Sequence, residues 1–386
     1  MAAAPRPSFD GHNDVLLKLW RAEQKGEDPV ALFRDGAPGH LDAPRMRAGG
    51  MTGGLFAVFV PNEGLDLDDM EAETSKDGYD LPLPPELSYA EAAGPALAMA
   101  GILMSLQRAG VLRVCRSAAE IEAANEAGEL AAVLHFEGAE AIDREFRSLD
   151  LLEAAGLKSI GPVWSRPTAY GAGVPFRFPS GPDTGPGLTE AGRALVAECA
   201  RRRLLVDLSH ITEAGFWDVA EVYDGPLVAT HSNAHAATPH ARNLTDRQLD
   251  AIKERDGIVG LNYATGFLRE DGRMVATDTL GDAVRHMAHL VERLGEDRVG
   301  LGSDFDGALI PSPIGDAAGL PALERALAEA QFGDALIDKI FRGNWMRALK
   351  AVWGECAPRR PSNARATRSK VTALQHIPLP HDRSPR

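Results

Sequence analysis

The sequence predicts a (β/α)8 barrel of the TIM type, an α/β fold in which eight parallel strands alternate with helices. Three observations favour this fold. Eight short runs rich in β-forming residues recur along the chain, each followed by turn or polar residues. Stretches rich in Ala, Leu, Glu and Arg with helical periodicity separate them, and strand alternating with helix indicates a parallel sheet. No GxGxxG motif follows the first run, which argues against a dinucleotide-binding open sheet.

The predicted elements can be taken in chain order. The strand candidates are SFDGHND (8–14), GGLFAVFV (53–60), LAAVLHFE (130–137), KSIGPVWS (158–165), RLLVDLSH (203–210), PLVATHS (226–232), GIVGLNY (257–263) and RVGLGSDFDG (298–307). The clearest amphipathic helix candidates are residues 88–110, 189–202, 245–257 and 279–297. The insert at about 62–88 is too polar and proline-rich for the core, so we expect a long loop over one barrel face.

Composition bounds the organisation of the chain. We expect residues 1–357 to form a single domain and residues 358–386 to form a disordered tail, because residues 359–386 carry seven Lys/Arg against one Asp and no apolar periodicity. The whole chain has a formal net charge of −14, which argues against nucleic-acid binding. Three widely spaced cysteines indicate no disulfide framework. With no long apolar run, we expect a cytoplasmic protein without membrane attachment.

Ionisable residues gather at the carboxyl ends of the strand candidates. They are His12, Asp14, Glu137, His210, His231 and Asp304. In a barrel these ends converge on the face where catalysis occurs. Imidazole and carboxylate ligands without sulfur suit zinc, and also manganese or iron. Two ions about 3.5–4 Å apart need a bridging ligand, and Glu137 is the candidate, since Lys158 lies at the wrong end of its strand to serve as a carbamylated bridge.

Other polar residues receive structural interpretations. Asp306, two positions after Asp304, is expected to cap a loop or helix. His286 and His289 lie three apart on a predicted helix, and we expect them on its solvated face.

At these positions the sequence resembles the membrane (renal) dipeptidase family of zinc peptidases, within the amidohydrolase-like metal-dependent hydrolases. The matching segments are DGHND (10–14), FEG (136–138), DLSH (207–210), THS (230–232), RN (242–243), GSDFDG (302–307) and GNW (343–345), in the family's order. The resemblance implies one zinc ion on His12 and Asp14, a second on His210 and His231, and Glu137 between them. It further implies that Asp304 is the proton-transferring acid/base and that Arg242 holds the substrate's terminal carboxylate.

One position departs from the family. Where its mammalian members carry a substrate-binding histidine, this sequence has Trp164, in the segment GPVWSRP. Indole offers one N–H donor and an apolar face, and it can neither accept nor carry a proton. We expect Trp164 to line the substrate pocket; the other interpretation is that it packs beneath the 62–88 insert. Mammalian members are also secreted and lipid-anchored, which is not carried over.

The leading functional prediction is a dipeptidase with two zinc ions that cleaves L,L-dipeptides or those with a C-terminal D-residue, by attack of a metal-bridged hydroxide. The alternative is a metal-dependent amidohydrolase acting on another carboxylate-bearing amide, such as an N-acyl amino acid or a lactam. A catalytically silent metal-binding protein would require a lost ligand or a lost Asp304, and neither is missing. The expected partner is a small dipeptide-like substrate, and homodimer formation is left open.

Overall fold

The computed structural model describes residues 4–62 and 72–354, and within them eight parallel strands form one continuous sheet. In sheet order the strands are β10 (Leu205–Val206), β6 (Leu157–Gly161), β5 (Ala131–Glu137), β2 (Met51–Phe59), β1 (Ser8–Asn13), β13 (Val299–Gly302), β12 (Ile258–Asn262) and β11 (Val228–Ala229). A short strand, β4 (Arg113–Val114), pairs with β5 outside this path. All eight predicted strands are therefore present.

The two edges of this sheet meet, which makes it a barrel. A parallel bridge joins Asp207, next to β10, to Val228 of β11. The Leu208 amide donates to the Val228 carbonyl at 2.8 Å. Closure leaves no free sheet edge along this seam. The predicted (β/α)8 barrel is confirmed.

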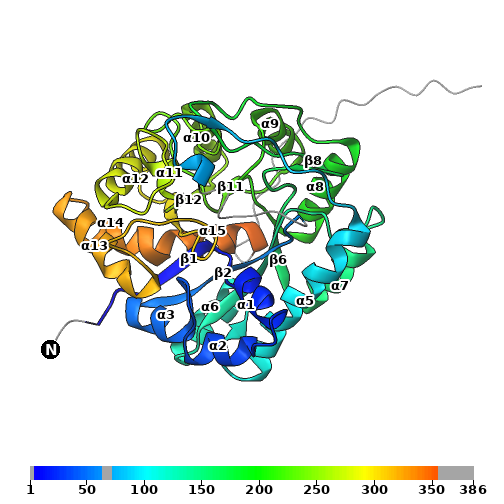
Figure 1. Ribbon diagram of the computed structural model, residues 1–386, viewed down its shortest axis with the longest axis horizontal. Helices are drawn as coiled ribbons and strands as arrows, with labels where there is room; N and C mark the ends of the chain where they lie inside the picture. Colours follow the sequence, from blue (N-terminus) through cyan, green and yellow to red (C-terminus); the bar gives the residue numbers. More distant parts are fainter. Residues whose placement is uncertain (1–3, 63–71, 355–386) are drawn as a thin grey trace, which may run out of the picture. The chain divides into compact units, whose positions relative to one another are not determined.

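Helices surround the strands (Figure 1). They are α1 (Val15–Glu23), α2 (Pro29–Asp35), α3 (Ala43–Gly49), α5 (Tyr89–Arg108), α6 (Ala118–Glu126), α7 (Arg147–Ala155), α8 (Glu190–Arg202), α9 (Glu213–Val222), α10 (Asp246–Glu254), α11 (Thr265–Leu268), α12 (Leu280–Leu294), α13 (Leu320–Glu329), α14 (Asp334–Asp338) and α15 (Asn344–Trp353). A 3₁₀ turn (Ala317–Gly319) and a π-helical turn (Lys339–Gly343) join the last of them.

Helix α15 covers the end of the barrel at which the strands begin. Its side chains bind carbonyls that lie just before or at the start of strands: Arg347 binds the Gly257 carbonyl, and Trp353 the Lys158 carbonyl. Trp345 is fully buried, and its indole N–H donates to the Leu301 carbonyl at 2.8 Å. Any side chain larger than that of Gly11 in β1 would clash with the Trp345 ring. The functional face is therefore the opposite end, where the strands finish.

The strands end earlier than the sequence predicts. The run 203–210 was expected as one strand, but β10 covers only Leu205–Val206, and His210 has a left-handed φ of 66°. Asp304, in the predicted run 298–307, likewise has φ 60° and lies beyond β13. The backbone leaves the ladder where its side chains turn into the barrel mouth, so alternation alone could not place the strand ends.

The described part of the 62–88 insert, residues 72–88, lies against loops that follow strands β6 and β12. Its short strand β3 (Tyr79–Asp80) pairs with β9 (Arg177–Phe178), and β7 (Pro167–Thr168) pairs with β8 (Gly171–Ala172) in the same loop as β9. The Tyr79 hydroxyl donates to the Gly272 carbonyl at 2.8 Å. Residues 63–71 and the predicted basic tail, 358–386, lie outside the described residues.

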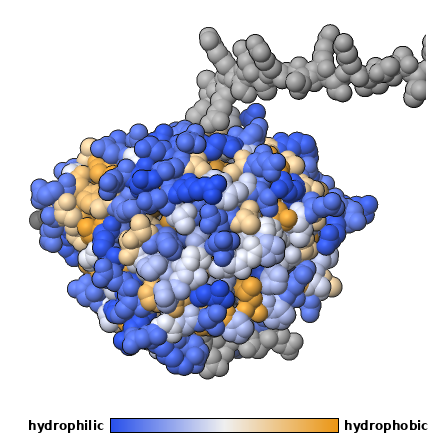
Figure 2. Space-filling view, turned by 90° about the horizontal axis from the view of Figure 1, so that it is seen from above, coloured by the Kyte–Doolittle hydropathy of each residue, from blue (hydrophilic) through white to orange (hydrophobic). Residues whose placement is uncertain are grey.

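Helix α5 is long and apolar enough to cross a membrane, judged by length and composition alone. In the barrel it buries Met99, Leu103 and Leu106 in the main hydrophobic core, and a capping box of Ser88 and Glu91 begins it. The face drawn in Figure 2 is mostly hydrophilic, with hydrophobic residues in small separate groups. The buried apolar side chains and the capping box of α5 are those of a helix that packs on the barrel from its outer layer.

Candidate metal centre

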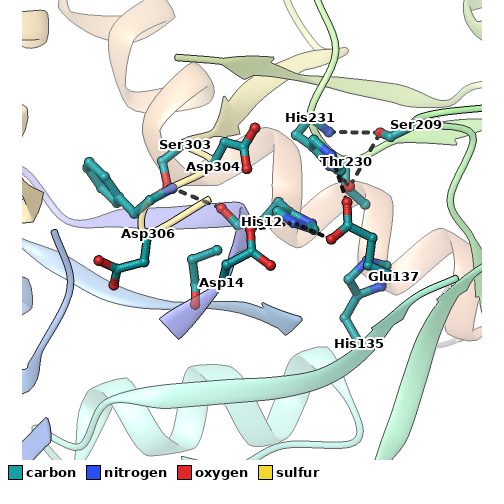
Figure 3. A network of polar contacts seen from close by, with 12 residues as sticks. His12, Asp14, His135, Glu137, Ser209, Thr230, His231, Ser303, Asp304 and Asp306 are labelled. Carbon is teal, nitrogen blue, oxygen red and sulfur yellow. Dashed lines mark hydrogen bonds and ion pairs between the residues drawn. The ribbon is translucent and has the colours of Figure 1, made fainter. Parts of the chain in front are cut away.

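The carboxylate of Glu137, the last residue of β5, lies beside His12 and His231 (Figure 3). Its Oε1 atom is 2.9 Å from His210 Nε2 and 3.4 Å from His231 Nε2. Its Oε2 atom is 3.6 Å from His12 Nε2, and that nitrogen is 3.4 Å from Asp14 Oδ2. The five ligand candidates thus form two clusters that share one carboxylate, with one oxygen turned to each.

These residues fit a pair of metal ions. All five are buried, and ligand atoms of His12, Asp14 and Glu137, and those of Glu137, His210 and His231, lie within 4.8 Å of one another. Both ring nitrogens of His12 and the Oδ1 atom of Asp14 are buried without a hydrogen-bond partner. Buried polar atoms are rarely left unpaired unless a metal or another ligand satisfies them. Nitrogen and oxygen donors without sulfur suit zinc in a catalytic site.

The electrostatics of the centre also favour cations. Burial together with the negative charge of Glu137 raises the pKa of Asp14 to about 7. Burial would lower the pKa of His12, but the charges of Glu137 and Asp14 outweigh it and raise that pKa well above its usual range. Both shifts reflect closely packed carboxylates in a buried space. A bound divalent cation would compensate this charge and displace the protons.

Neighbouring hydroxyl groups orient two of the histidines. The Thr230 hydroxyl donates to Asp207 Oδ2 at 2.6 Å, so its oxygen accepts from Nδ1 of His231 at 2.8 Å. This arrangement places the proton of neutral His231 on Nδ1 and leaves the Nε2 lone pair facing Glu137. Ser165 Oγ lies 2.7 Å from Nδ1 of His210. The sequence interpretation assigned no role to Asp207, Thr230 and Ser165, although each lies within three residues of a predicted site residue.

Asp304 lies at the edge of this centre, where Asn262 holds it. The Asn262 side-chain amide donates to Asp304 Oδ2 at 2.9 Å, and its carbonyl oxygen accepts from the Ala264 amide at 2.6 Å, which fixes the orientation of the amide group. Burial raises the pKa of Asp304. The sequence interpretation missed Asn262 as a site residue. Asn262 is the last residue of β12, so its position at a strand end was the signal that could have identified it.

Arg242 contacts the backbone of one of the ligand candidates, His231. It is buried, its Nη2 donates to the His231 carbonyl at 3.1 Å, and its guanidinium lies over the Phe267 ring at 5.3 Å. Burial lowers the pKa of Arg242 to about 10, against the opposing charges of Asp304 and Glu137. Its Nε atom has no partner among the described residues. The guanidinium therefore still has donor capacity next to the centre.

A cavity of about 340 Å³ opens onto three of the predicted metal ligands, Asp14, Glu137 and His210. It is lined by Asp14, Leu17, His40, Phe59, Thr74, Glu137, Trp164, Phe176, His210, Phe267, Met274, Asp304, Asp306, Gly307, Ala308 and Leu309. Trp164 forms part of an aromatic wall, with its ring centroid 4.7 Å from that of Phe59 and 5.8 Å from that of Phe176. Its ring also lies 5.7 Å from that of His210, beside the metal ligands.

Two residues outside this centre can be compared with their sequence interpretations. His286 was expected on a solvated helix face, and this is wrong: it is fully buried, and its ring bonds the Thr238 hydroxyl and the Leu268 carbonyl. His289, one turn later, is partly buried and pairs with Asp246. Asp306 holds a loop, since its carboxylate accepts from the amides of His40 and Leu41. Figure 3 shows this carboxylate turned away from Glu137.

Comparisons with known proteins agree with this geometry. A family model described as membrane dipeptidase (peptidase family M19) matches residues 3–358. A solved metallo peptidase from Rhodobacter sphaeroides, liganded with a phosphinate mimic of the dipeptide L-Ala-D-Ala, is 51% identical with a TM-score of 0.88, covering 90% of this chain and 100% of that one. The solved dipeptidase AC, of family M19, is also 51% identical, with a TM-score of 0.87, covering 90% of this chain and 99% of that one.

A curated relative is similar over a shorter range. The "uncharacterized protein in pqqA 5′ region" of Klebsiella pneumoniae is 49% identical over 245 residues, which is 64% of this chain and 90% of the relative.

Proposed function

Because the chain belongs to the membrane dipeptidase family (peptidase family M19) and is a metallopeptidase of that family, we propose that it hydrolyses small dipeptides with two zinc ions. The ligands would be His12 and Asp14 for one ion, His210 and His231 for the other, and Glu137 for both. The observation that carries this proposal is the position of Glu137, whose two oxygens face different ligand clusters. A single tetrahedral ion would not use both.

When bound, the two zinc ions would supply Lewis-acid chemistry, polarising the scissile carbonyl and lowering the pKa of a water molecule. The residues of the chain then handle the proton. Asp304 would accept it from the attacking water and deliver it to the leaving amine. Asn262 occupies Oδ2 of Asp304, so Oδ1 is the oxygen left for this transfer. The raised pKa of Asp304 suits a group that must both take and release a proton near neutral pH.

Arg242 would bind the C-terminal carboxylate of the substrate. A guanidinium presents parallel N–H donors that match a carboxylate, and the unpaired Nε of Arg242 is available for this. Its position over Phe267, which lines the cavity, brings the charge close to the substrate space. A free carboxylate would also compensate a buried cation, and this favours substrates with a free C-terminus.

Two further observations support the proposed substrate class. The Rhodobacter sphaeroides metallo peptidase holds a mimic of L-Ala-D-Ala, which supports dipeptides with a small C-terminal D-residue for this chain as well. The aromatic wall of Trp164, Phe59 and Phe176 favours an apolar or planar group next to the scissile amide. That wall also supports a second candidate, an amidohydrolase of N-acyl amino acids or lactams that carry a carboxylate.

A panel of amides assayed with the zinc-loaded protein tests the proposal. It would contain L,L-dipeptides, dipeptides with a C-terminal D-residue, N-acyl amino acids and the C-terminal amides of the best dipeptides. We expect dipeptides with free carboxylates to give the highest kcat/KM. If N-acyl amino acids or lactams exceed every dipeptide, the second candidate replaces the first. If no amide is cleaved, both are wrong.

A further inference from the structure

His40 lies on the cavity wall with all but one of its polar groups already paired. Its amide donates to Asp306 Oδ1 at 2.6 Å, and its carbonyl accepts from the Ala317 amide at 3.0 Å. Its ring nitrogen Nδ1 accepts from the Asp306 amide at 3.0 Å. Of the polar atoms of His40, only Nε2 has no hydrogen-bond partner among the described residues.

This pairing determines where the ring proton lies. Because Nδ1 accepts a backbone N–H, the neutral ring must carry its proton on Nε2. Burial lowers the pKa of His40, and although Asp306 opposes the shift, the positive charge of Lys18 adds to it. The ring is therefore neutral at physiological pH. It presents a fixed N–H donor rather than an acceptor or a charge.

The loop that carries His40 is held rigidly. The Asp306 carboxylate also accepts from the Leu41 amide at 3.2 Å and pairs with Lys18 Nζ at 2.7 Å. Gly39 has a left-handed φ of 110°, and a Cβ there would clash with the Asp306 carboxylate. Such a preformed donor needs little ordering when it binds a ligand.

The surroundings of His40 indicate what it would bind. The other polar groups of the wall include the carboxylates of Asp14, Glu137, Asp304 and Asp306, and much of the remaining wall is apolar. A neutral donor in this setting selects a hydrogen-bond acceptor, while the carboxylate of Asp306, which lies against His40 and is not a proposed metal ligand, disfavours an anionic acceptor at this place. We propose that His40 Nε2–H binds the amide carbonyl of a substrate side chain and makes the enzyme selective for dipeptides that contain Gln or Asn. This proposal rests on the proposed dipeptidase function.

Two substitutions separate the donor of His40 from its structural role. In His40→Asn the side-chain oxygen can replace Nδ1 as acceptor for the Asp306 amide, but no group reaches the place of Nε2. In His40→Gln the amide nitrogen reaches that place and keeps a donor there. His289→Asn, at a partly buried helix position paired with Asp246, is the matched control.

The substrates are isosteric pairs, Ala-Gln against Ala-Met and Gln-Ala against Met-Ala. In the unmodified zinc enzyme we expect the Gln substrate of one pair to have a kcat/KM about three- to tenfold higher, the effect of one net hydrogen bond. His40→Asn should abolish this preference, whereas His40→Gln and His289→Asn should keep most of it. Equal ratios in His40→Asn and the unmodified enzyme would overturn the proposal. Hydrolysis of Ala-Ala reports separately on the dipeptidase function.

A spectroscopic readout does not depend on turnover. In zinc-loaded Asp304→Asn, ¹⁵N shifts of the His40 ring should show the Nε2–H form, and addition of the preferred Gln dipeptide should move the Nε2 signal more than its Met counterpart does. A proton on Nδ1, or equal shifts with both dipeptides, would contradict the proposal even if no dipeptide is hydrolysed.

Discussion

At the scale of single residues, the centre depends on side chains that are not themselves ligands. The Thr230 hydroxyl donates to Asp207 and accepts from His231 Nδ1. These two hydrogen bonds determine the tautomer of His231. The Asn262 side-chain amide donates to Asp304 Oδ2 and so fixes the orientation of that carboxylate. Such supporting groups hold ligand and acid/base atoms at the orientations that the chemistry requires.

Thr230→Val should weaken metal binding while the fold persists. Valine has nearly the same shape, but it cannot accept from His231 Nδ1, so the ring loses its fixed tautomer. We expect zinc affinity to fall by about 10- to 100-fold, measured by competition with a chelator. Thr230→Ser, which keeps the hydroxyl, is the control, and the same affinity for both variants would exclude this role.

Asp304→Asn should separate catalysis from metal binding. The ligand set is unchanged, so zinc content should stay normal, while kcat should drop by at least about a hundredfold, the usual effect of losing a general acid/base. Metal analysis and steady-state kinetics on the same sample check both parts. An unchanged kcat would remove Asp304 from the mechanism.

At the scale of elements, helix α15 covers the end of the barrel at which the strands begin and fills the interior there. Trp345 occupies the strand-start end of the barrel beside Gly11 and Gly300, where a side chain of any size would meet its ring. The small residues of β1 and β13 and the large residue of α15 are therefore complementary. This packing supports the strand whose far end carries His12.

Trp345→Ala should destabilise the protein by about 3–5 kcal/mol, because it leaves a cavity that the surrounding strands cannot fill. Urea unfolding monitored by circular dichroism gives the free energy of unfolding. The control is Trp217→Ala on α9, where the ring is only partly buried and lies under Arg247. If both substitutions cost the same, the closing role of Trp345 would be refuted.

At the scale of the whole molecule, barrel closure brings together ligands that are far apart in the chain. Strands β1, β5, β10 and β11 supply or precede the five ligand candidates, and each strand aims its end at one mouth. The cost is a buried concentration of carboxylates, seen in the raised pKa values of Asp14 and Asp304. Bound cations would offset this cost.

Metal occupancy should therefore depend on pH. With a pKa of about 7 in the absence of metal, Asp14 is largely protonated below neutrality, and His12 is protonated as well. Protons then compete with zinc, so affinity should fall as pH decreases from 8 to 6 and each binding event should release protons. Chelator competition at pH 8 and pH 6 measures the zinc affinity, and we expect saturation at about two ions per chain. A pH-independent affinity, or saturation at one ion, would contradict the two-metal proposal.

The sequence alone was sufficient to predict the barrel and the gathering of the ligand candidates. Eight alternating strand and helix signals predict the topology, and polar residues at strand ends must meet at one mouth once the barrel closes, so local periodicity carried that information. Strand lengths were overestimated at residues such as His210 and Asp304, because left-handed backbone positions leave no periodic signal.

Only the tertiary structure decided which groups support the ligands and which way the remaining polar side chains face. His286 lies three positions before His289, which suggested a solvated helix face. It is buried instead, and its ring contacts the Leu268 carbonyl, 18 positions away in the chain. His40 carries no pattern of its own, and its tautomer depends on Asp306, which lies 266 positions away. Hydrogen bonds between distant segments depend on how loops pack after the barrel has closed, and no short-range pattern of residues records that packing.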